Sequence, residues 1–192
     1  MELTREAQVT EPLRASWYQW LAGYLSGLDR LDEAERAVRR ALELQPGSGA
    51  FHEQLGVIEI QRGNAQAAPA AAQQEIPGVW QYVAMALARQ VGSDRSAADA
   101  ALKALIDLDA EGAPYQIAEV YALHNDPDET FAWLDRACSR AAGMGYRLYD
   151  PFILRCKDDP RLPPRFAKRC VCQRRLKLAS EPEFLRLLPT LR

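Results

Sequence analysis

The sequence has few of the side chains on which most catalytic and metal-binding sites depend. Of its 192 residues, two are histidine and four are cysteine. His52 and His124 lie far apart, and neither has a second histidine four residues away, the spacing that a helical zinc motif needs. The chain also lacks a Gly-x-Ser-x-Gly elbow and a phosphate-binding glycine loop. We therefore predict that this chain is not an enzyme by itself.

The cysteines do not form a recognisable metal-binding pattern either. One residue separates Cys170 from Cys172, and Cys156 is the nearest further cysteine. Structural zinc usually takes cysteine pairs with roughly two to four intervening residues, completed by further ligands that are missing nearby. The sequence therefore predicts no metal site and no cofactor.

Long hydrophobic runs and an excess of one charge are missing as well. The apolar run at residues 82–88 falls far short of the roughly 20 residues that span a bilayer. The 24 basic and 26 acidic residues give a net charge of -2, which excludes a polybasic or histone-like protein. The N-terminus has no apolar segment typical of a secretory signal peptide. Four cysteines do not make a disulfide framework, so we expect a cytoplasmic protein.

The chain does contain an internal repeat. Small and apolar residues recur at a constant spacing of about 34 residues, in the pairs Leu21 and Leu55, Ala22 and Gly56, and Ala34 and Ala68. The next spacing is shorter, from Leu55 to Ala84 and from Ala68 to Ala97, and the one after it is close to the first, from Ala84 to Ile117 and from Ala104 to Ala137. Periods of this length are typical of stacked supersecondary units.

Each unit is predicted to form two amphipathic helices, because small residues alternate with larger apolar ones at helical spacing. In the first full unit these helices cover residues 17–28 and 29–44, and Pro46-Gly47 ends the second. The unit resembles the tetratricopeptide repeat, whose pattern of large, small and proline positions is met by Tyr18, Leu21, Ala22, Leu25, Ala34, Val38, Ala41 and Pro46. In the second unit Pro69 falls inside the second helix and Ile76-Pro77-Gly78 follows it, so we expect that helix to be short or kinked.

The predicted fold class is all-α, an alpha-alpha superhelix or solenoid of about four helix hairpins with a C-terminal capping helical segment. The units cover residues 15–48, 49–77, 78–110 and 111–142. Residues 1–14 are expected to be the second helix of a preceding repeat or an N-terminal cap. Residues 143–192 are expected to form an irregular segment that contains prolines, followed by basic capping helices.

Four segments resemble the sequences of the tetratricopeptide portions of bacterial regulators, namely residues 13–21, 27–35, 115–123 and 131–137. In that family the repeats commonly follow a winged-helix DNA-binding domain, an adenylate cyclase domain or a kinase domain. The resemblance implies an interaction module rather than a catalytic domain. It also leads us to expect that this chain is a fragment of a longer protein, with a natural N-terminal cap as the alternative.

The basic residues gather near the C-terminus. Residues 161–192 carry nine Lys or Arg against Glu181 and Glu183, a net charge of +7. This segment is expected to act as a capping helix, and it could also lie on an acidic face of the repeats or contact nucleic acid or lipid phosphate. Acidic pairs such as Asp32-Glu33 are expected at helix starts and are not predicted to be catalytic.

The concave side of such an array is built from the first helix of each unit, so exposed side chains on that helix would line a groove. The resemblance places in this groove Gln19, Glu53, Val57, Ile60, Tyr82, Arg89, Tyr115, Glu119 and Leu123. Tyr82 and Tyr115 fall at equivalent places in this alignment. They would anchor a peptide or a helix, or they would instead pack on neighbouring helices or on the C-terminal segment.

These observations predict a non-catalytic scaffold that binds a protein or peptide partner in its concave groove. Two alternatives remain open at this point. One is an adaptor that contacts nucleic acid or a membrane surface through the basic C-terminal segment, although the overall charge makes nucleic acid a poor partner. The other is an accessory segment whose catalytic domain lies upstream. The sequence does not indicate an oligomeric state.

Overall fold

The computed structural model describes residues 9–139 and 150–162, and within these residues the protein is all-helical, as predicted. Its elements are α2 (Ala15–Gly27), α3 (Leu31–Leu44), α4 (Phe51–Gln61), α5 (Ala67–Gln73), α6 (Val79–Gln90), α7 (Arg95–Asp109), α8 (Pro114–Leu123), α9 (Pro127–Ser139) and the short 3-10 helix η1 (Ile153–Cys156). Every helix in this part of the chain is too short or too polar to cross a membrane.

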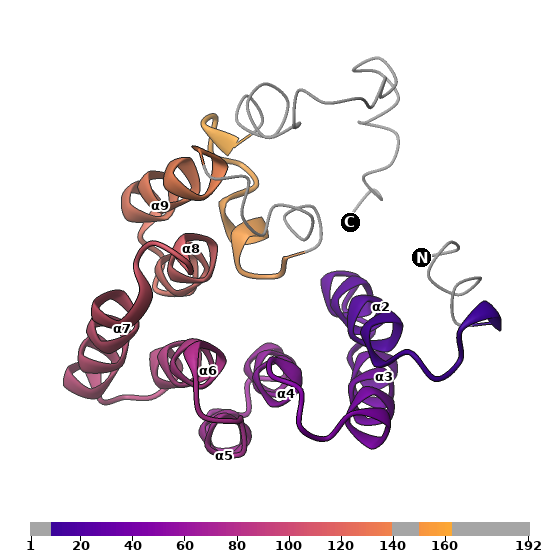
Figure 1. Cartoon of the computed structure of the whole chain (residues 1–192). Coiled ribbons are helices and arrows are strands. Elements are labelled where there is room, and N and C mark those ends of the chain that lie inside the picture. The colour runs from indigo at the N-terminus through magenta and orange to yellow at the C-terminus, as the bar shows by residue number, and fades with distance from the viewer. Residues whose placement is uncertain (1–8, 140–149, 163–192) are drawn as a thin grey trace.

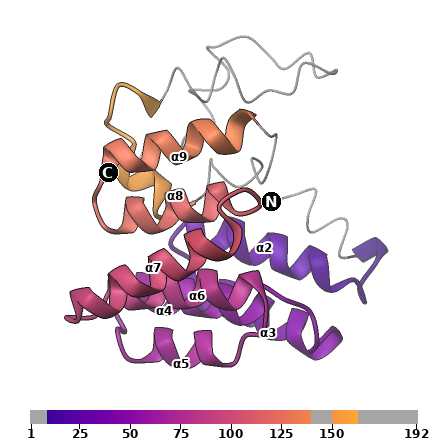
Figure 2. The same cartoon turned by 60° about the vertical axis from the view of Figure 1, so that its left-hand side comes forward.

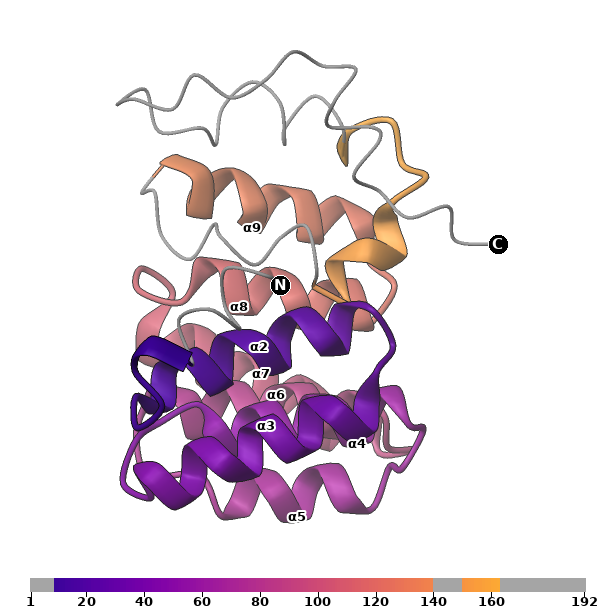
Figure 3. The same ribbon diagram turned by 90° about the vertical axis from the view of Figure 1, so that its right-hand side faces the viewer.

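The helices pack as four consecutive hairpins, because α2 contacts α3, α4 contacts α5, α6 contacts α7 and α8 contacts α9. The first helices of successive hairpins also contact one another, from α2 through α4 and α6 to α8. Figure 1 shows these first helices along the inner side of a curve and the second helices outside them. Figures 2 and 3 show that the helix axes run roughly side by side through the array.

Small residues let the two helices of each hairpin approach closely. A Cβ added at Gly56 of α4 would lie 3.6 Å from the backbone oxygen of Ala68 in α5. Ala22 and Ala34 occupy the corresponding places in the first hairpin, and both are fully buried. In the fourth hairpin Ala118 meets this need on α8, and Thr130 of α9 lies opposite with no exposed surface. Larger side chains at these crossings would force the helices apart.

The third hairpin is placed one position later than the sequence alignment predicted. Ala98 is 1% exposed and Ala97 is only half-buried, so Ala98 is the buried small residue of α7 that corresponds to Ala68 and Thr130. On α6 the place equivalent to Gly56 falls on Ala86, which is fully buried, and not on Met85, which is half-buried. The predicted spacings into and out of the third unit are therefore wrong by one position, because this hairpin has alanines at both candidate positions and their spacing alone cannot distinguish them.

The prediction that the helix containing Pro69 would be short is confirmed, since α5 has only seven residues. Pro69 is the third residue of α5, where a backbone N–H has no partner inside the helix and its loss costs little. The helix ends before Pro77-Gly78, and the chain then turns directly into α6.

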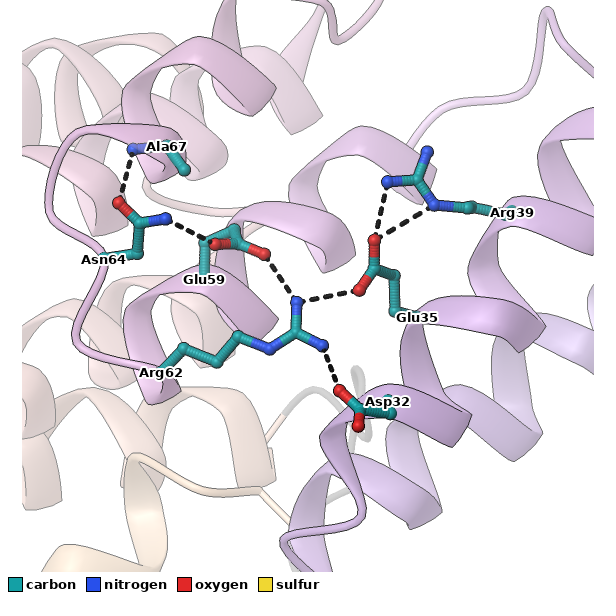
Figure 4. A network of polar contacts seen from close by, with 7 residues as sticks. All are labelled: Asp32, Glu35, Arg39, Glu59, Arg62, Asn64 and Ala67. Atoms are coloured by element: carbon teal, nitrogen blue, oxygen red, sulfur yellow. Dashed lines mark hydrogen bonds and ion pairs between the residues drawn. The ribbon is translucent and has the colours of Figure 1, made fainter.

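A cluster of ion pairs joins the first two hairpins at their outer edge (Figure 4). The Arg62 guanidinium, just after α4, lies 2.7 Å from Asp32 and 2.7 Å from Glu35 of α3, and 2.8 Å from Glu59 of its own helix. The hydrogen bond from Arg62, followed by that from Arg39, lowers the pKa of Glu35. The same bond between Arg62 and Glu35 is the largest cause of the raised pKa of Arg62. Polar contacts therefore hold α3 against α4 at this junction.

Residues 150–162 follow the fourth hairpin and return to the inner side of the curve, where η1 contacts α8 (Figure 1). Phe152 and Ile153 are 1% and 0% exposed and belong to the same apolar cluster as α6 and α8. Arg155 donates from Nη1 to the backbone oxygen of Leu123 over 3.2 Å. Arg161 lies 2.6 Å from Asp128 of α9 and stacks over the Phe131 ring.

Several sequence predictions lie outside the described residues. These concern the N-terminal segment at residues 1–8, the irregular segment at residues 143–149, the Cys170 and Cys172 pair, and the basic segment beyond residue 162.

Candidate functional site

The inner side of α2 and α4 carries half-exposed side chains at the positions where a groove was expected. Gln19 of α2 and both Glu53 and Val57 of α4 are half-buried, whereas Ile60 is 5% exposed and packs in the core. The two helices are fastened by polar contacts: Gln54 Nε2 donates to the backbone oxygen of Gln19 over 3.3 Å. This part of the inner surface therefore offers both polar and apolar side chains to solvent.

On α6 the corrected register changes which residues face inward. The structural equivalent of Glu53 and Tyr115 is Val83, which is fully buried, and not Tyr82. Tyr82 is 39% exposed and corresponds instead to His52 of α4, and Arg89 beside it is half-buried. The prediction that Tyr82 and Tyr115 occupy equivalent places is therefore wrong, because the sequence alignment of the third hairpin was shifted by one position.

On α8 the expected groove residues are covered. Tyr115 is 2% exposed and Leu123 is 8% exposed, and the segment at residues 150–162 packs against this helix. The Tyr115 hydroxyl donates to Asp150 Oδ2 over 2.7 Å. Of the two outcomes considered for this tyrosine, the structure has it packed under the C-terminal segment, so its ring is not open to a partner.

Two carboxyl groups meet where this segment touches α8. Asp150 is 4% exposed, and besides the Tyr115 hydroxyl it accepts hydrogen bonds at Oδ1 from the backbone N–H groups of Phe152 over 2.8 Å and Ile153 over 2.9 Å. Glu119 of α8 forms a side-chain hydrogen bond to Asp150. Burial, followed by the neighbouring Asp150, raises the pKa of Glu119 well above its ordinary value. Burial therefore favours the protonated form of Glu119.

A second pair of carboxyl groups lies at the start of α4. Glu75 is 2% exposed and accepts hydrogen bonds from the backbone N–H groups of Glu53 over 2.9 Å and Ile76 over 3.0 Å. It thereby satisfies one of the unpaired N–H groups in the first turn of α4 and places a negative charge at the favourable end of the helix dipole. Burial, then Glu75 and then Asp150, raise the pKa of Glu53 to about 8.

These four residues, Glu53, Glu75, Glu119 and Asp150, are called the inner carboxyl cluster below. The first and last interact electrostatically although α4 and the segment after α9 are far apart in the sequence. Glu53 and Glu119 keep some solvent contact, yet burial is the largest cause of both raised pKa values. The curvature of the array explains the combination, because it surrounds a partly exposed side chain with protein on several sides.

Sequence reasoning selected Glu53, Tyr115 and Glu119 but missed Glu75 and Asp150. Glu75 occupies in the second hairpin the buried position that Ala41 holds in the first. An acidic side chain at a position where a small buried residue is expected could have marked Glu75 as a candidate. Asp150 precedes Pro151, a pairing typical of a helix or turn start. Neither residue type indicated that the two would lie near one another.

The chemistry available to this site is binding of polar groups and exchange of protons. Among the described residues, no group of His, Cys, Asp or Glu side chains is arranged to hold a metal ion. The thiol of Cys156 is half-buried, and burial raises its pKa, which makes it a poor nucleophile at neutral pH.

Comparison of the chain with protein-family models found no matching model. Searches among curated proteins and among solved structures likewise found no match. The function proposed below therefore rests on the residues and their arrangement.

Proposed function

We propose that the protein is a tetratricopeptide-type scaffold that binds an extended or helical segment of a partner protein along the inner side of α2 and α4. The order of the hairpins and the small residues at their crossings support this assignment. The observation that carries it is the contrast along the inner side: Gln19, Glu53 and Val57 are half-buried and keep some solvent exposure, while Tyr115 and Leu123 of α8 are buried beside residues 150–156.

The chemistry of these side chains favours a particular class of ligand. Val57 offers an apolar contact, Gln19 offers amide hydrogen bonds, and Glu53 offers a carboxyl group that gains charge when a cation lies beside it. A partner segment with an apolar residue next to a lysine or arginine would use all three. A strongly acidic segment would bring further negative charge to a site that already holds Glu53 and Glu75.

The proposal includes a place in a larger assembly. The similarity of residues 13–21 and 131–137 to repeats of bacterial regulators supports a role as a cytoplasmic module that recruits a partner without catalysing a reaction. The alternative adaptor would act through the basic C-terminal segment, which lies beyond the described residues.

The test compares two double variants that differ only in the side of the array they alter. The first replaces the inner residues, as Gln19→Ala with Val57→Ala, and the second replaces exposed residues of the outer helices, as Arg36→Ala with Leu108→Ala. Partners captured from the source organism by each protein are identified and their affinities titrated. The inner variant is expected to lose roughly tenfold or more in affinity, and the outer variant is expected to bind like wild type. Equal affinities for the two variants would remove the inner surface from the proposal.

A further inference from the structure

Cys138, in the last turn of α9, is half-buried and disulfide-bonded. The chain has three other cysteines, at positions 156, 170 and 172. Cys156 carries a free thiol, and its side chain packs against the apolar cluster of α6 and α8. Within one chain, this leaves Cys170 or Cys172, which follow the described residues, as the partner of Cys138.

The path of residues 150–162 brings the chain within reach of this cysteine. Arg161 Nη1 lies 2.6 Å from Asp128 in the first turn of α9, and Leu162, the next residue, is 5% exposed. Cys138 follows Asp128 by ten helical residues, about 15 Å along the axis of α9. Cys170 follows Leu162 by eight residues, which span roughly 26 Å when extended. The chain is therefore long enough for either cysteine of the pair to meet Cys138.

The distribution of charge favours the same approach. Residues 161–192 carry nine Lys or Arg against two Glu, whereas α9 carries three acidic residues against one arginine. Attraction between these opposite charges raises the local concentration of the segment at α9. Four Lys or Arg also lie within three residues of the Cys170-x-Cys172 pair. Nearby positive charge stabilises the thiolate, the form in which a cysteine attacks a disulfide.

We propose that Cys138 and the Cys170-x-Cys172 pair form a reversible redox site that ties the basic C-terminal segment to the last helix of the array. One cysteine of the pair is bonded to Cys138, and the thiolate of the other attacks that bonded sulfur. A disulfide then forms within the pair, the bond to Cys138 breaks, and Cys138 leaves as a thiolate that takes up a proton. Full reduction converts two small thiols, such as glutathione, into one small disulfide, and such a disulfide reverses the process.

The site gives the basic segment two states. Oxidation to the Cys138 disulfide confines its positive charge to the end of the array, and exchange or reduction releases it. A reversible bond is compatible with the cytoplasmic role proposed above, because disulfides in reducing compartments are usually transient and redox-sensing. The redox site lies on α9 and does not depend on the inner surface of α2 and α4, so the two proposals stand or fall separately.

The test maps the disulfides of the full chain after equilibration at about pH 7 with oxidised and reduced glutathione in a series of ratios. Thiols are alkylated rapidly, and the unreduced protein is digested with trypsin for mass spectrometry. Trypsin places Cys138, Cys156 and the Cys170-x-Cys172 pair in different peptides, since a lysine or arginine lies on both sides of each. At oxidising ratios we expect the Cys138 peptide joined to that of the pair, with Cys156 alkylated, and at reducing ratios this link should disappear. Alkylated Cys138 at every ratio, a link to Cys156, a bond between two chains, or a link that resists every ratio would each overturn the proposal.

Cysteine variants test the exchange step within the same experiment. The oxidised wild type is expected to contain both the link to Cys138 and the disulfide within the pair, because the two forms interconvert. Cys170→Ser and Cys172→Ser each leave one cysteine of the pair, so only the link to Cys138 is expected. Cys156→Ser is the matched control and should give the wild-type pattern. A wild type that never forms the disulfide within the pair would overturn the exchange, and this result does not depend on the folding of any variant.

Discussion

Both ends of the inner surface are built from the first helices of hairpins, but they differ in the solvent exposure of their inward side chains. At α2 and α4 the inward side chains Gln19, Glu53 and Val57 are half-buried and keep some solvent exposure. At α8 the equivalent side chains include Tyr115, and residues 150–162 lie over it. Position in the repeat therefore sets where a side chain points, and the segment after the last hairpin decides whether that side chain meets solvent.

The two ends of the array also belong to separate apolar clusters. One apolar cluster joins α2 and α3 with Phe51 and Ile58 of α4, and a second cluster runs from Ile60 through α6 and α8 to Phe152. Where these clusters adjoin, polar contacts hold the chain together, including the Arg62 ion pairs and the hydrogen bond from Gln61 Nε2 to the backbone oxygen of Ser26 over 3.0 Å. The first hairpin is therefore joined to α4 by an apolar cluster as well as by polar contacts.

The largest expected effect comes from truncating Tyr115 of α8, with the exposed Tyr82 of α6 as the comparison. Tyr115→Ala removes a ring that is 2% exposed, together with the hydroxyl that donates to Asp150, so unfolding in denaturant should show a loss of about 3–5 kcal/mol. Tyr82→Ala removes a ring that is 39% exposed and should cost no more than about 1 kcal/mol. Similar losses for the two variants would contradict the contrast in burial.

A smaller effect is expected from pH, because Glu53 holds a proton in the folded protein that the unfolded chain releases above about pH 4.5. Its raised pKa therefore reduces stability progressively as the pH rises from about 5 to about 8. Glu53→Gln should gain stability relative to wild type over this range, by about 1 kcal/mol at pH 7, since partial exposure screens the charge. Thermal or denaturant unfolding of both proteins at several pH values measures this difference. A difference that is independent of pH would remove Glu53 from the cluster.

The smallest effect is expected at the junction of the first two hairpins. Arg62→Ala removes ion pairs to Asp32, Glu35 and Glu59 and should cost about 1 kcal/mol, with less loss at high salt. Arg40→Ala breaks an exposed pair with Glu43 and a contact with Tyr18, and should cost less than Arg62→Ala. Denaturant unfolding at low and high salt separates the two. A loss for Arg62→Ala no larger than that for Arg40→Ala would mean that the cluster does not hold the hairpins together.

The helical hairpins were predictable because their spacing is local and repeated. Small residues at Ala22, Ala34, Gly56 and Ala68 mark where helices cross, and Pro69 shortens α5 for a reason that lies within a few residues. The register of the third hairpin was not predictable in the same way. Alanines at both 97 and 98 satisfy the pattern, and only packing against α6 selects Ala98.

The covering of α8 was harder to predict because it depends on contacts between distant parts of the chain. Tyr115 and Asp150 lie 35 residues apart, and neither belongs to a sequence motif that includes the other. The sequence left open whether this tyrosine would anchor a partner or pack under the C-terminal segment. Deciding between them requires the position of residues 150–156, which the repeat period does not specify.

The most direct measurement of the contrast along the inner surface is hydroxyl-radical footprinting of the intact protein at about pH 6, resolved at single tyrosines. Tyr115 is expected to be labelled at least about tenfold more slowly than Tyr82, because its ring lies under residues 150–156 and the Tyr82 ring is exposed. Labelling of Tyr115 as fast as Tyr82 would contradict the account, because the Tyr115 ring would then not be covered by residues 150–156.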